Sequence, residues 1–282
     1  MRLFASDLDG TLLNESFGID QENLTAIRAL EDAGIRFAIA TGRAYYDVVG
    51  ITEQYGLRCA VICNNGACVY DADGRLIHKS AVPPSMLRKL CNYLHDNGIF
   101  FGINSLTALN LLTNWEEILR GEICQSSEQE FCRVKEVVLS QKGLRFIDSF
   151  EEFISGSIDG CSVSVMGLIH SKLENLMEFV RSCDGLAMTV SGYNSLEIAV
   201  AGSSKADALG RLAFHLGIPQ EQTVAVGDNY NDLEMLKTAA ISFAMKNAPQ
   251  DIKDISTYVT ASHKDHGVAQ AIYNILDGGQ TT

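Results

Sequence analysis

The sequence predicts an α/β protein with a parallel sheet flanked by helices, into which a second, α+β domain is inserted. Over the first 66 residues, short apolar runs alternate with segments of helical spacing, which is typical of parallel βαβ units. The same alternation returns near residue 196, after a middle stretch that lacks it. One sheet is therefore begun before the middle stretch and completed after it.

Three apolar runs of the N-terminal segment are predicted strands, and polar or glycine residues follow each of them. They span residues 3–5, 36–40 and 59–63. Helical spacing predicts helices over 23–33 and 45–55, and Gly34 and Gly56 close them as C-caps. In parallel βαβ units with right-handed crossovers the strands all end at the same edge, so we expect the loops after these strands to meet there.

Two turn signals follow the third strand. Asn65-Gly66 and Asp73-Gly74 flank alternating segments at 67–70 and 75–78, which predicts a β-hairpin that leaves the sheet. Pro83-Pro84 is the best linker candidate in the sequence.

The middle stretch mixes helices and strands without regular alternation, which indicates a separate α+β domain. The predicted helices there span residues 86–95, 150–154 and 171–183. The predicted strands span residues 99–103, 108–113, 161–166 and 186–190, and residues 116–141 are compatible with either state. The first sheet is then continued by predicted strands at 196–200, 223–226 and 241–244, with helices at 205–216, 233–239 and 266–276.

The composition describes a globular protein with a strongly acidic balance. Its 282 residues suit two domains and carry a formal net charge of −13, which disfavours nucleic acids and anionic membranes as partners. None of the eight cysteines forms a Cys-x-x-Cys pair, which favours reduced core thiols over a disulfide framework or a zinc site. No signal peptide or transmembrane stretch is visible, so we expect a cytoplasmic protein.

Two carboxylates, Asp7 and Asp9, stand where the first strand ends and the chain turns at Gly10. Carboxylates at the end of a buried strand are costly unless a metal ion or a reacting phosphate uses them. The alternative is an ordinary Asp-Gly turn. The full pattern Asp-x-Asp-Gly-Thr is sharper than such a turn and favours a functional site.

Three further motifs are expected at the same edge of the sheet. They are Thr41-Gly42, Lys205 at the start of a helix, and Gly227-Asp228-x-x-Asn231-Asp232. Taken singly, each has an ordinary alternative, respectively the start of a loop, a solvated surface charge and a helix N-cap. Since all four motifs fall in order at one edge, we favour a common site.

The residue types of these motifs suit two ligands. Carboxylates from the first and last motifs suit Mg²⁺, a hard cation that prefers oxygen donors. A hydroxyl, backbone amides, an ammonium group and a carboxamide suit a phosphate dianion. The metal and Lys205 would offset the repulsion between that dianion and the carboxylates. The remaining aspartate of the first motif can act as nucleophile or proton carrier.

The four motifs resemble those of the haloacid dehalogenase-like (HAD) hydrolase superfamily, and most closely its Cof-type phosphatase subfamily. Ala-Thr-Gly-Arg at 40–43, Asn65-Gly66-Ala67, Leu196-Glu197-Ile198 and Gly267-Val268-Ala269 also fit that group. The resemblance implies a Rossmann-like catalytic core at 1–83 and 190–282. It also implies an inserted C2-type cap, of the C2B class, at 84–189, which would set substrate specificity.

The resemblance also implies roles for individual residues. Asp7 would be the nucleophile that forms an aspartyl-phosphate, and Asp9 would be the acid and base. Mg²⁺ would be held by Asp7, the Asp9 carbonyl and Asp228, with Asp232 in support. The groups expected to hold the phosphoryl oxygens are the Leu8 amide, Thr41, Gly42, Lys205 and Asn231. Arg43 and Asn65 either contact substrate or serve only as a surface ion pair and a turn residue.

These roles predict a Mg²⁺-dependent phosphoric monoester hydrolase that acts on sugar phosphates or phosphorylated cofactors. A sugar phosphomutase on the same fold is the alternative, and a catalytically silent binding protein is less favoured because every catalytic position is present. The expected partner is a small phosphorylated metabolite, and the protein is expected to be a monomer or homodimer. The segment from His263 to His266 departs from the subfamily's acidic stretch, and we expect its histidines to be exposed rather than ligands.

Overall fold

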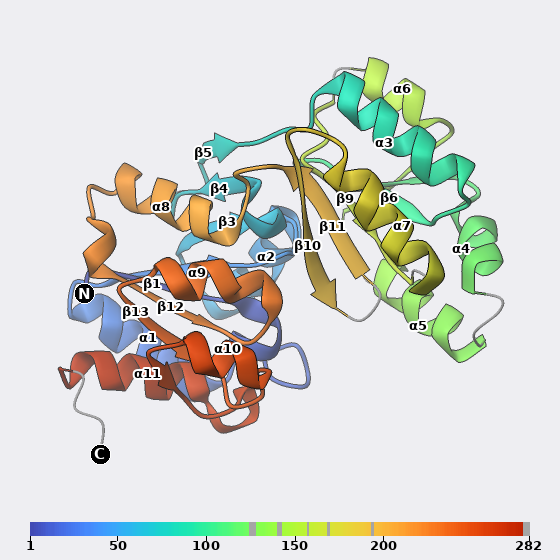
Figure 1. Cartoon of the computed structure of the whole chain (residues 1–282). Coiled ribbons are helices and arrows are strands. Elements are labelled where there is room, and N and C mark those ends of the chain that lie inside the picture. The colour runs from blue at the N-terminus through green and yellow to red at the C-terminus, as the bar shows by residue number, and fades with distance from the viewer. Residues whose placement is uncertain (124–127, 140–142, 157, 168–169, 193–194, 279–282) are drawn as a thin grey trace. The chain divides into compact units, whose positions relative to one another are not determined.

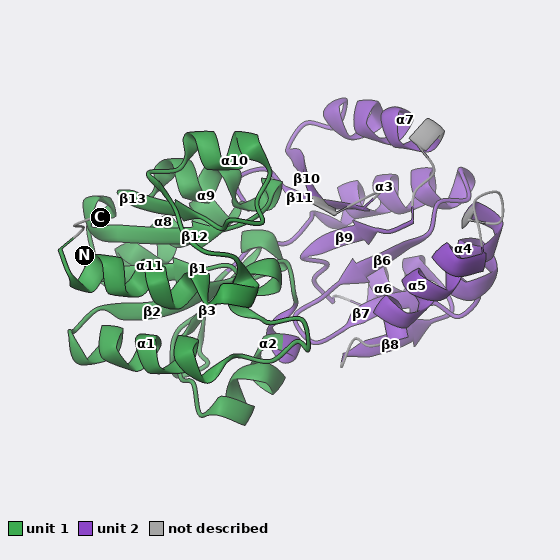
Figure 2. Cartoon of the chain, turned by 90° about the horizontal axis from the view of Figure 1, so that it is seen from below, with its two compact units in different colours: residues 1–43, 48–78, 204–282 green, residues 44–47, 79–203 purple. Residues whose placement is uncertain are grey.

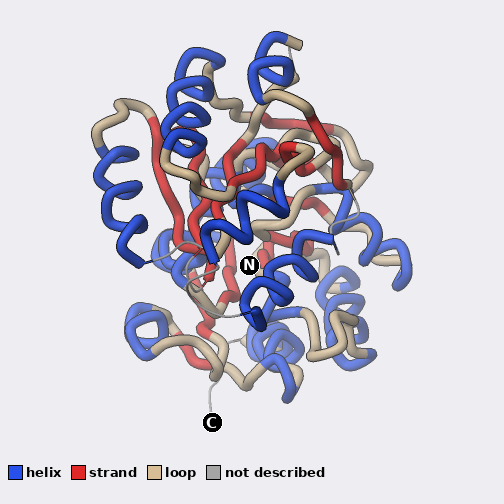
Figure 3. The backbone as a smooth tube through the Cα atoms, turned by 90° about the vertical axis from the view of Figure 1, so that its right-hand side faces the viewer, coloured by secondary structure: helices blue, strands red, loops and turns tan. Residues whose placement is uncertain are grey.

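The computed structural model describes the chain except residues 124–127, 140–142, 157, 168–169, 193–194 and 279–282. The described residues form two compact units (Figure 2). The first unit contains residues 1–43, 48–78 and 204–282, and the second contains residues 44–47 and 79–203. Figure 3 distinguishes their helices, strands and loops by colour.

An eight-stranded sheet forms the centre of the first unit, within the described residues, in the order β14-β13-β12-β1-β2-β3-β4-β5. Its strands are β1 (Leu3–Ser6), β2 (Arg36–Ala40), β3 (Ala60–Cys63), β4 (Cys68–Tyr70), β5 (Leu76–Lys79), β12 (Thr223–Gly227), β13 (Ile241–Ala244) and β14 (Tyr258–Val259). The strands from β14 to β3 are parallel, so their carboxyl ends share one edge. In β1, Leu3 lies beside Thr223 of β12 and Arg36 of β2.

Helices cover this sheet. They are α1 (Gln21–Asp32), α2 (Tyr45–Thr52), α8 (Lys205–His215), α9 (Leu233–Thr238), α10 (Gln250–Ile255) and α11 (Gly267–Leu276). Buried side chains of α8, α9 and α10 pack with Leu3, Ala5 and Ala38 of the sheet in one core cluster. The helices α1 and α11 lie side by side, at the lower left of Figure 1.

The hairpin at residues 67–78 does not leave the sheet, contrary to the expectation from its turn signals. After the turn at 64–66, β4 pairs antiparallel with β3, so the hairpin extends the sheet at that edge. The turn places Asn64 and Asn65 in the left-handed region, each with φ 48°. Asparagine adopts this conformation more readily than most residues, which lets the chain reverse there.

The second unit contains a six-stranded sheet, within the described residues, in the order β10-β11-β9-β6-β7-β8. Its strands are β6 (Phe101–Asn104), β7 (Leu109–Leu112), β8 (Leu144–Ile147), β9 (Ser162–Val165), β10 (Leu186–Gly192) and β11 (Ser195–Val200). Its helices are α3 (Pro84–Asp96), α4 (Trp115–Ile123), α5 (Glu128–Leu139), α6 (Phe150–Ser155) and α7 (His170–Arg181). One core cluster gathers α3, α6 and α7, and another gathers α4 and α5.

The strand at 196–200 lies in the second sheet, not in the first as expected. It is β11, and it pairs antiparallel with both β9 and β10. The first unit therefore resumes at Ser204, whereas a return at residue 190 was expected. Residues 116–141, for which the sequence left helix and strand both possible, are helical where described, as α4 and α5.

The described cysteines are free thiols. Six of them are buried, namely Cys59, Cys63, Cys68, Cys91, Cys161 and Cys183, and Cys132 is exposed. Cys124 lies outside the described residues. No helix among the described residues is long and apolar enough to cross a bilayer.

Candidate active site

The first motif leaves β1 through a single wide turn. The Leu13 amide donates to the Leu8 carbonyl at 2.9 Å, and Gly10 inside the turn has φ 74°. A Cβ atom at Gly10 would lie 2.5 Å from Oδ2 of Asp228, too close for any side chain. Glycine therefore supplies both the left-handed backbone and the close approach of the first motif to the fourth.

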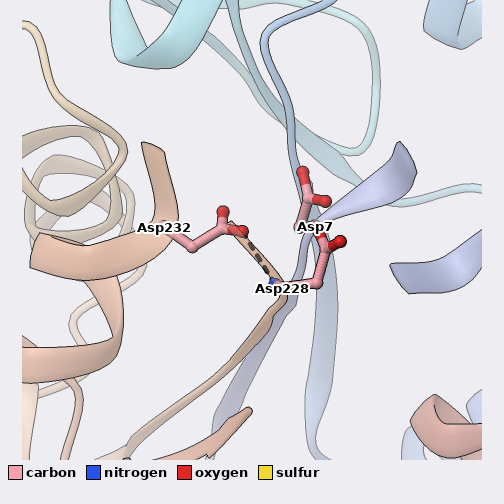
Figure 4. Close-up of side chains that lie close together, drawn as sticks. All are labelled: Asp7, Asp228 and Asp232. Carbon is pink, nitrogen blue, oxygen red and sulfur yellow. Dashed lines mark hydrogen bonds between the residues drawn. The ribbon is translucent and has the colours of Figure 1, made fainter. Parts of the chain in front are cut away.

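Three carboxylates meet at this edge. Asp7 follows β1, Asp228 follows β12, and Asp232 lies one short turn further along the chain (Figure 4). One oxygen of each lies within 4.8 Å of the others. Asp7 and Asp232 are buried and Asp228 is half-buried. So much negative charge out of water requires a compensating cation.

Lys205 supplies part of that compensation. It is the first residue of α8, where Ser204 and Asp207 form a reciprocal capping box. Its Nζ donates to Oδ1 of Asp7 and to Oδ1 of Asp232, both at 2.7 Å, and its side chain is fully buried. The alternative of a solvated surface charge is therefore excluded.

Asp232 has a supporting position in this group. Its Oδ1 accepts from Lys205, and its Oδ2 accepts from the backbone amides of Asp228 and Asn229 at 3.0 and 3.1 Å. Asp232 and Asn229 form a capping box around the turn at 230–232. The helix N-cap that was the alternative for the fourth motif is therefore present, alongside the contact of Asp232 with Lys205. The carboxylate both orients Lys205 and fixes the loop that carries Asp228.

Burial and mutual repulsion perturb these groups. Burial, followed by the charge of Asp232, raises the pKa of Asp7 well above its ordinary value, although Lys205 opposes the shift. Burial and Asp232 raise the pKa of Asp228 to about 6. Burial alone would lower the pKa of Lys205, but Asp232 and Asp7 outweigh it and raise that pKa. The lysine thus stays charged, and its charge does not fully offset the burial and mutual repulsion of the carboxylates.

The second motif lies against two asparagines. The Thr41 hydroxyl accepts from the Arg43 amide at 3.1 Å, and the Thr41 carbonyl accepts from the Asn65 amide at 3.0 Å. A Cβ atom at Gly42 would lie 3.0 Å from Nδ2 of Asn65. The Asn231 side chain donates to Oδ1 of Asn65 at 3.1 Å. The second and fourth motifs thus meet through Asn65, as their place at one sheet edge predicts.

Comparison with known proteins decides the family. The model of the haloacid dehalogenase-like hydrolase family matches residues 4–272. The chain belongs to this family. This hydrolase is 34% identical over 285 residues to the phosphatase YwpJ of Bacillus subtilis (strain 168), covering 98% of this chain and 100% of the relative.

Two further relatives match the hydrolase over nearly its whole length. The 5-amino-6-(5-phospho-D-ribitylamino)uracil phosphatase YwtE of Bacillus subtilis (strain 168) is 32% identical and covers 99% of both chains. The solved structure of a haloacid dehalogenase-like hydrolase from B. subtilis is 33% identical, with a TM-score of 0.86, covering 98% of this chain and 100% of the other. The expected fold class and the expected enzyme class, a phosphatase of this superfamily, are thereby confirmed.

In this hydrolase the Arg43 side chain forms an ion pair with the Asp9 carboxylate. The guanidinium donates from Nε to Oδ2 at 2.7 Å and from a terminal nitrogen to Oδ1 at 2.5 Å. The ion pair that was one alternative for Arg43 is therefore present, and its partner is the expected acid and base. The Arg43 guanidinium carbon also lies 5.9 Å from the ring centre of Phe17, which is largely exposed.

Two residues to which the sequence assigned no role contact Asp228. The Thr11 hydroxyl donates to Oδ1 of Asp228 at 3.3 Å, and the Asn247 side chain donates to Oδ2 at 3.1 Å. Thr11 belongs to the first motif. Asn247 had a weaker signal, as a polar residue shortly after β13, whose carboxyl end lies at the same edge.

Proposed function

We propose that the protein is a Mg²⁺-dependent phosphatase that hydrolyses small phosphate monoesters through an aspartyl-phosphate on Asp7. The observation that supports this most is the buried Lys205 between Asp7 and Asp232, at 2.7 Å from each. A fixed ammonium group at the nucleophile offsets the repulsion between a phosphate dianion and a carboxylate. Phosphoryl transfer depends mainly on such positioning and charge neutralisation.

The residues present fit a divalent cation. The pKa values of Asp7 and Asp228 are raised by burial and by neighbouring carboxylates, so the cluster lacks positive charge even with Lys205 in place. Oxygen donors of this kind suit Mg²⁺. Asp7, the Asp9 carbonyl and Asp228 would hold the ion, and Asp232 would support it from behind. When bound, the ion would neutralise charge on the phosphoryl group.

Two proton transfers accompany the reaction. In the first step a carboxylate oxygen of Asp7 attacks phosphorus, the bond to the leaving oxygen breaks, and the Asp9 carboxyl protonates that oxygen. In the second step the Asp9 carboxylate accepts a proton from water as the water oxygen attacks phosphorus. The bond to Asp7 then breaks and inorganic phosphate is released. Lys205, Thr41, Asn231 and the backbone amides of Leu8 and Gly42 would bind the phosphoryl oxygens.

The substrate is a phosphorylated metabolite of small size. YwtE is named for a phosphorylated ribityl-uracil, so a primary phosphate ester on a sugar-alcohol chain is one substrate class to test. Sugar phosphates and phosphorylated cofactors are the others. We assign substrate specificity to the second unit, where Asn104 and Asn110 are buried and hydrogen-bonded within the sheet, so its more exposed polar side chains are the ones to test.

Substitution of Asp7 tests the proposal. We expect Asp7→Asn to abolish phosphate release from p-nitrophenyl phosphate and from a metabolite panel, with an unchanged circular dichroism spectrum. Asp32→Asn, at an exposed position of α1, is the matched control and should keep full activity. Excess chelator should abolish activity and added Mg²⁺ should restore it. Full activity of Asp7→Asn, or in chelator, would refute the mechanism.

A further inference from the structure

Asn247 contacts both motifs that carry the carboxylates. It lies between β13 and α10, and its side-chain nitrogen donates to the Gly10 carbonyl at 2.9 Å and to Oδ2 of Asp228 at 3.1 Å. An amide NH₂ group has two hydrogens in one plane, so both bonds can be made at once. One side chain therefore bridges the first-motif turn and the Asp228 carboxylate.

The other end of Asn247 is also fixed. Its Oδ1 accepts from the backbone amide of His263 at 3.2 Å. His263 begins the segment that departs from the subfamily pattern. The segment is itself held to the first unit, since the Gly267 and Lys246 amides donate to Ser262 and Ala261 carbonyls at 3.0 and 3.3 Å. The amide plane of Asn247 is thus held from both sides.

Asp228 depends on these contacts for its orientation. The Thr11 hydroxyl reaches its other oxygen at 3.3 Å, a longer contact than that of Asn247. The side chain is only half-buried and is packed against Gly10, where no Cβ atom could fit. A carboxylate that must present oxygen to a cation needs neighbours that limit its rotation.

We propose that Asn247 is a positioning residue for the divalent cation, which it orders by fixing Asp228 relative to the Gly10 turn. The inference rests on the proposed metal dependence. Asn247 would act through Asp228 and not as a ligand of the ion. Residues that orient metal ligands in this way typically contribute about 10- to 100-fold to metal affinity.

Calorimetric titration of the substrate-free protein with Mg²⁺ tests the inference. We expect Asn247→Ala to raise the Kd for Mg²⁺ by about 10- to 100-fold. Saturating Mg²⁺ should return its kcat to within about threefold of the wild type, because the chemical groups are intact. Asn97→Ala, which removes a side-chain bond to the Tyr93 carbonyl in the second unit, is the control and should leave the Kd unchanged.

The outcomes separate the inference from the proposed function. If the wild type binds Mg²⁺ and Asn247→Ala binds it equally well, Asn247 is only structural and the inference is wrong. If Asn247→Ala has a lower melting temperature but an unchanged Kd for Mg²⁺, Asn247 is likewise only structural and the inference is wrong. If the wild type itself binds no Mg²⁺, the proposed metal dependence fails and the inference fails with it. Should Asn247→Ala not fold, Asn247→Ser, which cannot reach both acceptors, is judged by the same criteria.

Discussion

Arg43 holds both carboxylate oxygens of Asp9 in a two-bond ion pair, with contacts of 2.7 and 2.5 Å. The two side chains are 29% and 47% exposed, so the pair contributes little to folding. Its consequence concerns the proposed proton transfers. While both oxygens accept from the guanidinium, the direction of the Asp9 side chain is fixed, and each oxygen keeps a second lone pair that can exchange a proton with a leaving group.

Removing this pair is expected to change activity more than stability. Arg43→Ala should alter the free energy of unfolding by less than about 1 kcal/mol, because the pair is partly exposed. It should lower kcat for an alkyl phosphate about tenfold, because Asp9 loses its fixed direction. Arg43→Lys keeps the positive charge but cannot donate from two fixed nitrogens to both Asp9 oxygens, so we expect an intermediate kcat. Steady-state kinetics with thermal unfolding would check this, and an unchanged kcat would show that the pair plays no part in turnover.

Loss of the Lys205 charge should destabilise the first unit. Lys205→Met leaves Asp7 and Asp232 buried without their cation, which we expect to cost about 3–5 kcal/mol in the absence of divalent metal. The raised pKa of Asp7 means that the folded state takes up a proton more readily than the unfolded state. Lys205 opposes that rise, so its removal raises the pKa of Asp7 further, and the deficit should be larger at pH 8 than at pH 5, where protonation relieves the repulsion.

Chemical unfolding followed by circular dichroism would measure that deficit. Lys237→Met is the control, since Lys237 lies at an exposed position and pairs with Glu234 in the same helix. Its loss should cost less than about 1 kcal/mol at either pH. Equal effects of the two substitutions would contradict the charge-compensating role of Lys205.

Gly66 fixes the start of α8, and hence Lys205. It has φ 102°, and a Cβ atom there would lie 2.1 Å from the Ser204 carbonyl oxygen. Gly217 shares the left-handed backbone, with φ 64°, but a Cβ atom would meet nothing within 4 Å. Gly217→Ala should therefore cost only about 1 kcal/mol of strain, whereas Gly66→Ala adds a backbone clash and should also lower activity. Unfolding measurements on both variants would report the backbone strain, and phosphate-release assays would report any displacement of Lys205.

Much of this site follows from one regularity of the sequence. The apolar runs before Asp7, Thr41 and Asp228 are strands of one parallel sheet, and parallel strands align their carboxyl ends. Polar residues directly after such runs can therefore be placed together without a structure. Lys205 does not follow from this regularity, because the strand before it lies in the second sheet, and the structure places it through the close approach of the 64–66 turn to the start of α8.

Other features of the fold and the site depend on neighbouring strands and side chains that the spacing of residues in the sequence does not reveal. An alternating segment such as 196–200 shows which side chains share a face, but not which strand lies beside it, and β11 joined the second sheet. Arg43 follows a strand as the motif residues do, yet its contact with Asp9 depends on side-chain direction. Asn247 is one polar residue in a turn, and its role becomes visible only when Gly10 and Asp228 lie next to it.

A buried carboxyl group in the second unit makes its stability depend on pH. Glu122 in α4 is 1% exposed, and its Oε2 accepts from the Phe100 amide at 2.5 Å. Among the described residues its Oε1 accepts no hydrogen bond, and Nζ of Lys172 lies 4.0 Å away. Burial raises the pKa of Glu122 to about 7, although the Phe100 amide and Lys172 oppose the shift.

Because this pKa is raised from 4.5 to about 7 in the folded state, the contribution of Glu122 to stability is fully present below the unfolded value and is lost as pH rises through 7. Glu122→Gln stays neutral and keeps an acceptor for the Phe100 amide. From pH 5 to pH 8 it should therefore gain up to about 3 kcal/mol relative to the wild type. Trp115, the single tryptophan, lies in the same helix and reports this unfolding by fluorescence. Glu117→Gln, at an exposed position of α4, should show no such gain, and a pH-independent difference for Glu122→Gln would mean that Glu122 does not titrate in this range.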